Sequence, residues 1–267
     1  MIDTLGSVPW LCAPLGGEMG LHIRAGLHRL PDVGLVEVAA PSPARIVDRR
    51  RDRRGECWVQ SPASVLDRHE LDDLFTRTLG LAVECGTCVV SGTDGDATVP
   101  ASVFERLARD LAAVGVTVVA DISGDEFAAL LDGGPPDVVK LSDEELVADG
   151  WAVDTEPGAL RAGVDQLHER GVDTVVITRA GSGALLAHGG RLQQLSGPEL
   201  SPVNSRGAGD SLTAAVATRL ARGDDPVEAV RLGVAAGALN ATRHGLGSGE
   251  RDAIEALAEQ VEIEDIG

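Results

Sequence analysis

Two glycines flank an alanine immediately before an aspartate, and this stretch opens a segment with helical periodicity. Glycine lets the backbone turn tightly and brings its N–H groups close to a ligand. The first turn of the following helix leaves N–H groups unpaired and carries the positive end of the helix dipole. Gly207, Ala208 and Gly209 are therefore candidate donors to an anion, such as a phosphate whose charge changes during a reaction. Asp210 is a candidate to accept the proton of an attacking hydroxyl.

The same four residues also have a purely structural interpretation. Glycine-alanine-glycine stretches occur in many unrelated turns, and an aspartate at the start of a helix is often only a cap. Both interpretations stay open at the level of this motif, so other segments of the chain must decide between them.

An arginine-rich stretch is a second candidate for binding a phosphate group. The window 41–60 has six arginines against three acidic residues, which gives it a local charge of +3. Guanidinium groups bind phosphates through paired hydrogen bonds, so one of them could recognise a phosphorylated substrate. The alternative is a solvated hairpin turn, which we favour for 49–54, while both interpretations stay open for the first arginine. The six are Arg45, Arg49, Arg50, Arg51, Arg53 and Arg54.

Cys85 and Cys88 have the spacing of a metal-binding or redox pair, but the sequence does not complete such a site. A structural zinc site takes four ligands, and Cys12 and Cys57 do not form a second pair. A redox pair would lie where a strand turns into a helix, whereas this pair leads into a strand. We therefore interpret both as buried small hydrophobic residues. The six histidines are scattered and match no metalloprotease or catalytic-triad pattern.

The overall composition narrows the class of protein. The chain has 267 residues, of which 43% are hydrophobic and 24% charged, as in ordinary globular proteins. Its net charge of −19 opposes binding to nucleic acid and anionic membranes, so we expect neither as a partner. The longest apolar run, 111–120, is too short to span a bilayer, and no secretory signal follows Met1. Four cysteines suit a reducing compartment, so we expect a cytoplasmic protein.

The elements that must position these residues alternate between strands and helices. Apolar strands that alternate with helices predict an α/β domain with a mostly parallel sheet covered on both faces. Residues 34–60 are expected to form a small β excursion from it. Expected strands cover 9–15, 34–39, 44–48, 56–60, 88–92, 116–122, 137–141 and 173–179, with a hairpin over 183–195 around Gly189-Gly190. Expected helices cover 18–29, 67–79, 100–114, 156–170, 209–222, 226–243 and 250–261.

The glycine turn and its helix, NSRGAGDSLTAAVATRLARG, resemble the C-terminal signature of the ribokinase-like, PfkB-type carbohydrate kinases. Further blocks follow the family's order: GGEMG (16–20), VVKLSDEEL (138–146), VVITRAGSGALL (175–186) and TRHGLGSG (242–249). VVSGTDGD (89–96) and VVADISGDEF (118–127) resemble strand ends of the 1-phosphofructokinase branch. The resemblance spans nearly the whole chain. It implies a ribokinase-like three-layer α/β/α fold in one domain over 1–267, with 34–60 as a small β lid.

The resemblance also implies an activity, which is transfer of the ATP γ-phosphate to a hydroxyl of a sugar or sugar phosphate with Mg²⁺. Fructose 1-phosphate is the substrate that we expect first. Asp210 matches the family's catalytic base, and Gly207, Ala208 and Gly209 match its anion hole. Glu145 matches the glutamate that orders the magnesium ion. The other matches are Thr178, Gly181, Gly183, Ser142 and Asn240 on the nucleotide side, and Gly17 and Arg45 on the substrate side.

The chain departs from the family pattern at four single positions and at its front. Asn204 replaces a common aspartate, Ser142 an asparagine, Ala180 a glycine and Glu18 an aspartate, and none of these changes removes the proposed base. Family members begin with about 40 further residues that supply much of the sugar site. We expect either a truncated or mis-assigned start, which we favour because the catalytic end is intact, or a variant that has lost sugar binding.

Two rival functions fit the same residues. The first is a non-catalytic protein that binds a nucleotide or sugar phosphate, a relic of a kinase with a regulatory or structural role. The second is a nucleoside or vitamin kinase of the same superfamily, which differs only in its substrate. For partners we expect a small-molecule sugar or sugar phosphate, together with a second copy of the chain if the β lid forms a homodimer.

Overall fold

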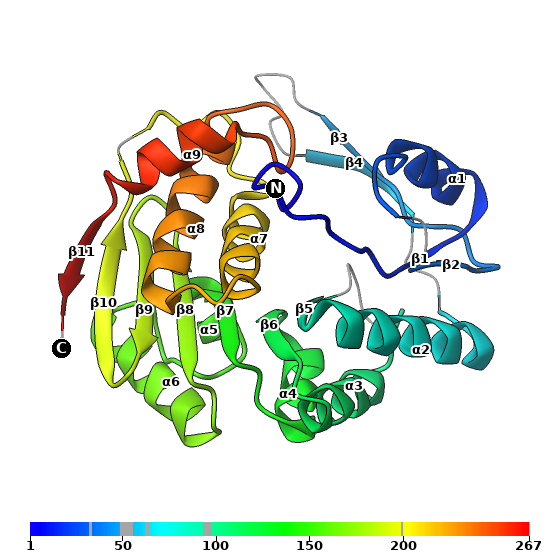
Figure 1. Cartoon of the computed structure of the whole chain (residues 1–267), viewed down its shortest axis with the longest axis horizontal. Coiled ribbons are helices and arrows are strands. Elements are labelled where there is room, and N and C mark those ends of the chain that lie inside the picture. The colour runs from blue at the N-terminus through cyan, green and yellow to red at the C-terminus, as the bar shows by residue number, and fades with distance from the viewer. Residues whose placement is uncertain (32–33, 49–55, 62–64, 93–97, 199, 267) are drawn as a thin grey trace.

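A seven-stranded sheet forms the centre of the molecule in the computed structural model, which describes residues 1–31, 34–48, 56–61, 65–92, 98–198 and 200–266 (Figure 1). Its strand order is β11-β10-β9-β8-β7-β6-β5. Four neighbouring strands are parallel: β5 (Thr87–Ser91), β6 (Thr117–Asp121), β7 (Val138–Ser142) and β8 (Thr174–Arg179). Three further strands pair antiparallel: β9 (Gly183–His188), β10 (Arg191–Ser196) and β11 (Glu262–Asp265). The expected α/β class and mostly parallel sheet are confirmed.

The central strands are apolar on both faces because successive side chains of a strand point to opposite sides. Val118 and Ala120 of β6 are buried in one hydrophobic cluster, and Val119 between them is buried in another. In β7, Val139 belongs to the first cluster and Val138 to the second. The continuous apolar runs of the sequence therefore form the middle layer of a sheet that helices cover on both sides.

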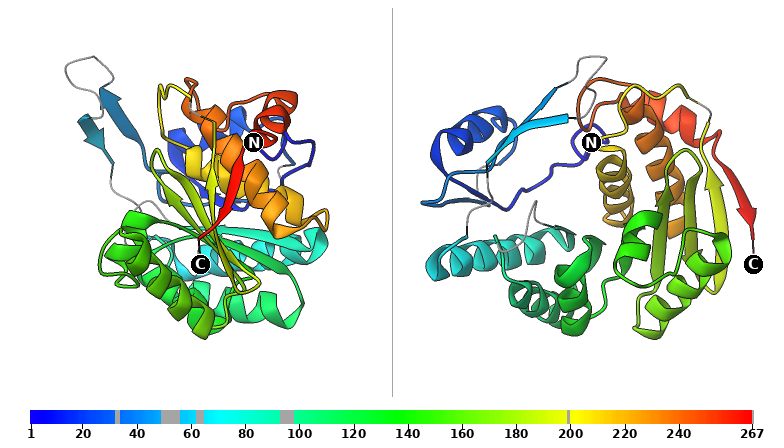
Figure 2. Two further views of the ribbon diagram at one scale, coloured as in Figure 1. Left: turned by 90° about the vertical axis from the view of Figure 1, so that its left-hand side faces the viewer. Right: turned by 180° about the vertical axis from the view of Figure 1, so that it is seen from behind.

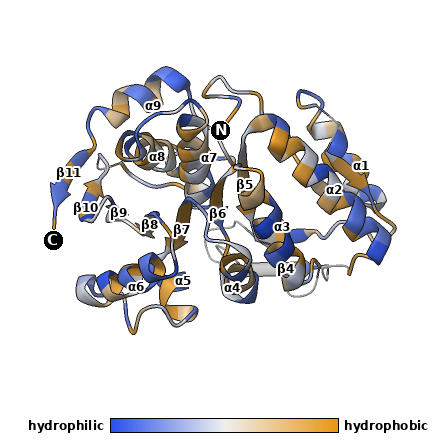
Figure 3. Ribbon diagram, turned by 60° about the horizontal axis from the view of Figure 1, so that its bottom comes forward, coloured by the Kyte–Doolittle hydropathy of each residue, from blue (hydrophilic) through white to orange (hydrophobic). Residues whose placement is uncertain are grey.

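Helices form the two outer layers, as Figure 3 shows in a view that looks obliquely along the strands. Polar colouring follows the outer sides of the helices, and apolar colouring marks β6 and β7. Among the described residues, no helix is both long and apolar enough to cross a membrane. One face packs against α2 (Arg68–Cys85), α3 (Ala101–Ala113), α4 (Gly124–Gly133), α5 (Asp143–Ala148) and α6 (Pro157–Glu169). The other packs against α7 (Ala208–Leu220), α8 (Pro226–Ala241) and α9 (Arg251–Ala258).

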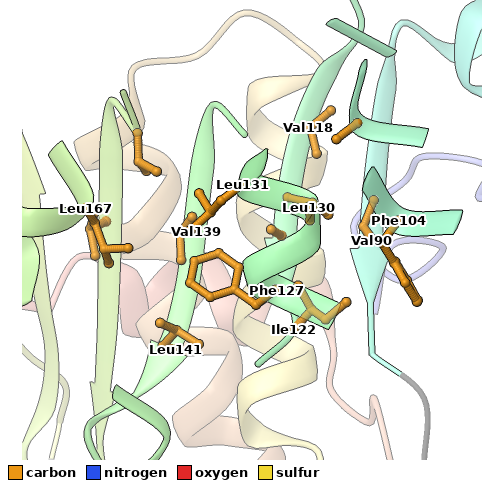
Figure 4. Close-up of a cluster of buried hydrophobic side chains, with 14 of the residues drawn as sticks. Val90, Phe104, Val118, Ile122, Phe127, Leu130, Leu131, Val139, Leu141 and Leu167 are labelled. Carbon is orange, nitrogen blue, oxygen red and sulfur yellow. The ribbon is translucent and has the colours of Figure 1, made fainter. Parts of the chain in front are cut away.

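Large apolar side chains fill the space between β5–β7 and the helices α3 and α4 (Figure 4). Phe127 on α4 is fully buried, and its ring meets the Trp151 ring edge-on with the centroids 6.1 Å apart. Phe104 on α3 lies beside Val90 of β5 (Figure 4). Burial of one such side chain contributes about 1.5–3 kcal/mol to stability. These contacts fix the strands whose ends carry the candidate site.

Two smaller sheets lie outside the seven-stranded sheet (Figure 2). In the first, β1 (Ala13–Leu15) and β2 (Leu35–Glu37) pair in parallel, joined through α1 (Gly17–Gly26). In the second, β3 (Arg45–Asp48) and β4 (Glu56–Gln60) pair antiparallel, and we call this pair the lid sheet. The excursion expected at 34–60 therefore holds β2, β3 and β4, while the strand that pairs with β2 comes from earlier in the chain.

A carboxylate at the start of α2 connects that helix to the segment after β2. Glu70 accepts hydrogen bonds from the Ala39 N–H at 2.6 Å and from the Asp67 N–H at 2.8 Å. The Asp67 carboxylate accepts in turn from the Glu70 N–H at 2.9 Å, which completes a capping box. The start of α2 thus holds the chain where it leaves the β1-α1-β2 unit.

Some elements differ from those predicted. The hairpin around Gly189-Gly190 is confirmed as β9 and β10, but α4 and β11 lie where the sequence patterns predicted no element. Helix α2 continues to Cys85, well beyond the expected end at 79, and stops at Gly86 in a left-handed conformation. The interpretation of Cys85 as buried is therefore wrong, because it is exposed at the end of this longer helix, and Cys88 is only partly buried.

Candidate active site

The carboxyl ends of the parallel strands lie along one edge of the sheet, and α7 begins at the same edge (Figure 1). β9 runs antiparallel to β8, and β10 antiparallel to β9, so β10 again runs in the direction of β8. In open α/β sheets, ligands bind at this edge. Asp121 and Ser142 end β6 and β7, and Thr178 is the penultimate residue of β8. These three residues and the start of α7 therefore share one edge.

Helix α7 begins at Ala208 in the glycine turn, one residue before the expected start at Gly209. Gly207 is the N-cap with φ 77° and ψ 7°, a left-handed conformation that favours glycine. A Cβ at this position would lie 3.0 Å from the Leu246 side chain, so the turn also lies against the 242–249 stretch. Asp210 is the third residue of the helix, counted from Ala208.

The N–H groups of Gly207, Gly209 and Asp210 have no acceptor in the part of the chain that the structure describes. The N–H of Ala208 differs, because it donates to the Ser205 carbonyl oxygen at 3.1 Å. Ala208 therefore uses its donor within the turn itself. The other three N–H groups lie at the positive end of the α7 dipole, where an anion binds favourably.

Asp210 presents a carboxylate beside these donors. No side chain caps α7, so the carboxylate does not act as the cap that the structural interpretation requires. It is exposed and makes no hydrogen bond or ion pair with the described residues. A carboxylate with this freedom can take a proton from a hydroxyl that approaches the anion site.

Asn240, a candidate nucleotide-binding residue, lies on α8 and is fully buried. Its amide nitrogen donates to the Arg206 carbonyl oxygen at 3.0 Å. Its amide oxygen accepts from the Ser248 N–H at 3.2 Å. The side chain thus joins the segment before the glycine turn to the 242–249 stretch, and both of its polar atoms are already occupied by backbone.

A buried ion pair lies next to the first turn of α7. The Lys140 ammonium is 2.6 Å from Asp121 Oδ1, with side-chain exposures of 9% and 15%. Asp121 Oδ2 accepts a hydrogen bond from the Thr213 hydroxyl at 2.7 Å. The same hydroxyl is 3.1 Å from the Gly209 carbonyl oxygen. Asp121 of β6 is therefore bonded to the helix that carries the candidate base, and Lys140 of β7 is bonded to Asp121.

Glu145 and Ser142 form a capping box at the start of α5. The Ser142 hydroxyl accepts from the Glu145 N–H at 3.1 Å, and Glu145 Oε2 accepts from the Ser142 N–H at 2.7 Å. The serine that replaces the family's asparagine thus orients the glutamate. The Oε1 atom has no partner among the described residues. No cluster of three metal-ligating side chains occurs among these residues.

The other nucleotide-side candidates surround the turn between β8 and β9. Thr178 is the Cα partner of Ser142 across β7 and β8, which brings these two candidates side by side. Gly181 has φ +74° in this turn, with open space around its Cα. Gly183 has φ +77°, and a Cβ there would lie 2.0 Å from the Leu195 carbonyl oxygen. Gly183 is therefore needed for the close approach of β9 and β10.

The two substrate-side candidates lie on the smaller sheets. Gly17 is the first residue of α1, exposed, with φ +62°. The preceding Gly16 donates its N–H to the Ser42 hydroxyl at 3.1 Å, which fixes the turn that carries Gly17. Arg45 is the first residue of β3 and is exposed. The arginines at 49–54 lie outside the described residues.

Comparison with known proteins identifies the family. The chain belongs to the pfkB family of carbohydrate kinases, whose model matches residues 47–253. It is 26% identical over 264 residues to an ATP-dependent 6-phosphofructokinase isozyme 2 of Mycobacterium tuberculosis, covering 97% of this chain and 76% of that protein. It is 31% identical over 166 residues to a 1-phosphofructokinase of Bacillus subtilis, covering 62% of this chain and 54% of that protein.

A solved structure agrees with this assignment. Phosphofructokinase-2 from Escherichia coli in complex with potassium matches with a TM-score of 0.85 at 25% identity, over 97% of this chain and 84% of that chain. The ribokinase-like three-layer fold is therefore confirmed. The protein is a carbohydrate kinase that acts on a sugar or sugar phosphate. Kinases of this family take ATP as the phosphate donor, generally with a metal ion.

Sequence reasoning missed the ion pair between Lys140 and Asp121 and the hydrogen bond between Thr213 and Asp121. Lys140 is the only lysine of the chain, but its type and position alone do not reveal its partner. The capping box of Ser142 and Glu145 was readable from the sequence, because a serine three residues before a glutamate is its signature.

Proposed function

We propose that the chain transfers the γ-phosphate of ATP to a hydroxyl of a sugar phosphate at the start of α7, with Asp210 as the base. The observation that supports this most directly is the exposed Asp210 carboxylate beside the open N–H groups of Gly207 and Gly209. A carboxylate and an anion site in one helix turn bring the proton acceptor and the phosphate together, which is what phosphoryl transfer requires.

In this mechanism, Asp210 accepts the proton of the substrate hydroxyl as its oxygen attacks the γ-phosphorus in line. The N–H groups of Gly207, Gly209 and Asp210 donate to the phosphate oxygens and stabilise the charge that develops on them. Ala208 supports this geometry through its hydrogen bond to Ser205. Asn240 acts indirectly, because it holds the segment before the turn and the 242–249 stretch in place.

On the nucleotide side we assign Thr178, Gly181 and Gly183 to the turn that borders ATP, with Ser142 on the neighbouring strand. Glu145 would hold Mg²⁺ together with ATP phosphates and water, through the Oε1 atom that the capping box leaves open. When bound, Mg²⁺ neutralises phosphate charge and orients the transferred group.

For the substrate we propose fructose 1-phosphate first, with Gly17 and Arg45 on its side of the site. The related proteins carry the names 1-phosphofructokinase and 6-phosphofructokinase, so fructose 6-phosphate is the comparison that matters most. We also propose that residues 1–267 act as one kinase domain, in which 34–60 is a lid. A homodimer through the lid sheet belongs to the same proposal.

The experiment measures ADP release by the purified chain with ATP, Mg²⁺ and a panel of sugar phosphates, free sugars and nucleosides. We expect release that depends on a sugar phosphate. Asp210→Asn should lower turnover by about a hundred- to ten-thousandfold, the usual contribution of a general base, while the ATP affinity changes little.

The matched control is Asp252→Asn, which removes an exposed carboxylate from the first turn of α9. It changes the charge by the same amount in the first turn of another helix. Turnover of this control should equal that of the unaltered chain. Near-normal turnover of Asp210→Asn would contradict the mechanism, and release only with nucleosides would contradict the substrate class.

A further inference from the structure

The Lys140–Asp121 pair lies on β6 and β7, whose other buried residues are all apolar. Val119 and Val138 precede the two charged residues on the same face of β6 and β7, and both are buried beneath α7–α9. Two residues further along each strand, that face presents a carboxylate and an ammonium 2.6 Å apart. The apolar layer therefore changes to an ion pair at the edge of the sheet where α7 begins.

The ammonium lies directly against the glycine turn. A Cβ on Gly209 would be 3.2 Å from Lys140 Nζ and 3.6 Å from its Cε, so the lysine packs on the Gly209 backbone. Asp121 holds the lysine from one side and bonds the Thr213 hydroxyl of the same helix from the other. The three side chains connect β6, β7 and the first turns of α7.

Stability alone does not account for this arrangement. Removing two charges from water costs as much as their attraction returns in many proteins, and an apolar pair of similar volume is often at least as stable. Asp121 also divides its two oxygens between Lys140 and Thr213, so the ammonium keeps further N–H groups with no acceptor among the described residues. Its positive charge therefore remains effective at the adjacent backbone.

We propose that Lys140 is a positioning residue of the anion site. Asp121 holds its ammonium, so that its positive charge adds to the N–H groups of Gly209 and Asp210 in attracting an anion. This inference rests on the proposed function, because it concerns the same site. The ammonium stabilises a phosphate bound at the turn. This stabilisation increases as negative charge develops on the transferred phosphoryl group. Thr213 keeps the carboxylate, and through it the lysine, in register with the helix.

Paired substitutions separate this role from a structural one. Lys140→Met leaves the Asp121 carboxylate buried without its partner, so this single variant should lose thermal stability. The double variant Lys140→Met/Asp121→Asn removes both charges and should recover most of the melting temperature. Its turnover should stay about ten- to a hundredfold below that of the unaltered chain, with a smaller change in the KM for ATP. Lys140→Arg, which keeps the charge, should retain more turnover than the double variant.

A matched pair of threonines on α7 tests the link to Asp121. Thr213→Val removes the hydroxyl that bonds Asp121. Thr218→Val removes a buried hydroxyl whose one hydrogen bond among the described residues goes to the Ala214 carbonyl oxygen of its own helix, at 2.7 Å. Turnover should fall in Thr213→Val and stay unchanged in Thr218→Val.

Lys140 also provides a direct readout, because the chain has no other lysine. Labelling with ¹⁵Nζ-lysine gives one ammonium signal that needs no assignment. We expect this signal to shift when the non-hydrolysable ATP analogue AMPPNP binds with Mg²⁺, or when inorganic phosphate occupies the turn. The Asp252→Asn control should show the same shift as the unaltered chain.

Two results would overturn the proposal. One is a stable double variant that turns over as fast as the unaltered chain. The other is a Lys140 signal that stays in place at saturating AMPPNP–Mg²⁺ and at high phosphate concentration. Failure of the proposed function gives a different outcome, in which the unaltered chain releases no ADP with any sugar phosphate. The NMR titration still decides on the anion site in that case.

Discussion

Arg45 begins β3 and presents an exposed guanidinium on the lid sheet. If it binds the phosphate of the substrate, Arg45→Ala removes a charge-assisted pair of hydrogen bonds. The KM for the sugar phosphate should then rise about ten- to a hundredfold, with a smaller change in kcat. Steady-state kinetics with varied sugar phosphate measures this KM. The KM of Arg45→Lys should lie between those of the unaltered chain and Arg45→Ala, because lysine keeps the charge but cannot form the paired hydrogen bonds of a guanidinium group.

Arg68→Ala is the control for this substitution. Arg68 starts α2, its side chain is 92% exposed, and its nearest acidic partner is Asp72 at 3.8 Å. An exposed pair of this kind contributes little, so the control should leave the KM unchanged. An unchanged KM in Arg45→Ala would remove the assignment of this residue to the substrate.

Cys85 and Cys88 are predicted to differ in reactivity toward alkylating reagents. Burial raises the pKa of the Cys88 thiol to about 12, with the nearby Cys12 and Cys85 thiols adding to the effect. Burial also raises the pKa of Cys85, but this residue is exposed at the end of α2. The thiolate is the reactive form, so at pH 8 only about one Cys88 in ten thousand is reactive. Cys85 should be labelled by iodoacetamide first, and the Cys88 rate should rise about tenfold per pH unit.

Peptide mass spectrometry after timed labelling measures both rates in the folded chain. In concentrated guanidinium chloride the two thiols should react alike, because unfolding removes the burial. Equal rates in the folded chain would contradict the environment assigned to Cys88.

At the residue scale, local spacing was more informative than long-range pairing. The serine and glutamate of the capping box are three residues apart, so one helix turn fixes their contact. Lys140 and Asp121 are 19 residues apart, and Thr213 and Asp121 are 92 apart. Their contacts depend on the register of β6 and β7 and on where α7 lies, which neither periodicity nor composition specifies. A buried ion pair of this kind therefore cannot be predicted from the sequence, even though Lys140 is the only lysine of the chain.

At the scale of elements, the strands buried on both faces were predictable because their apolar runs are continuous. Helix α4 was missed because it begins and ends with a glycine, Gly124 and Gly133, and glycines at both ends of a short segment are typical of a loop. Its residues Phe127, Leu130 and Leu131 nevertheless have helical spacing. Strand β11 has the sequence EIED with all four residues exposed, which is unfavourable for a strand. It exists because it pairs with the edge strand β10, a tertiary contact.

The turn between β8 and β9 offers a matched pair of glycine substitutions. Gly181→Ala places an alanine at φ +74° in open space, which should cost roughly 1–2 kcal/mol of unfolding free energy. Gly183→Ala has a similar φ, but its Cβ would lie 2.0 Å from the Leu195 carbonyl oxygen and force β9 and β10 apart. Its cost should be roughly 3 kcal/mol or more. Denaturant unfolding of both variants measures the difference, and equal costs would contradict the close approach of the two strands.

At the scale of the whole molecule, the lid sheet carries apolar side chains that the rest of the described chain does not cover. Ile46 and Val59 are Cα partners across β3 and β4, so their side chains lie on one face. They are 57% and 59% exposed. A two-stranded sheet is marginally stable by itself, so contact with a second copy would stabilise both lids.

Light scattering should therefore give twice the chain mass of 27.6 kDa for the unaltered protein. Because each copy carries a net charge of −19, repulsion between copies opposes the dimer, and added salt should strengthen it by screening. Ile46→Glu puts a charge on the proposed contact and should return the mass to that of one chain. Val153→Glu, at a position 88% exposed outside the lid sheet, adds the same charge and should leave the dimer intact. A monomer in the unaltered protein at high salt would count against lid pairing, as would an equal loss of mass in both variants.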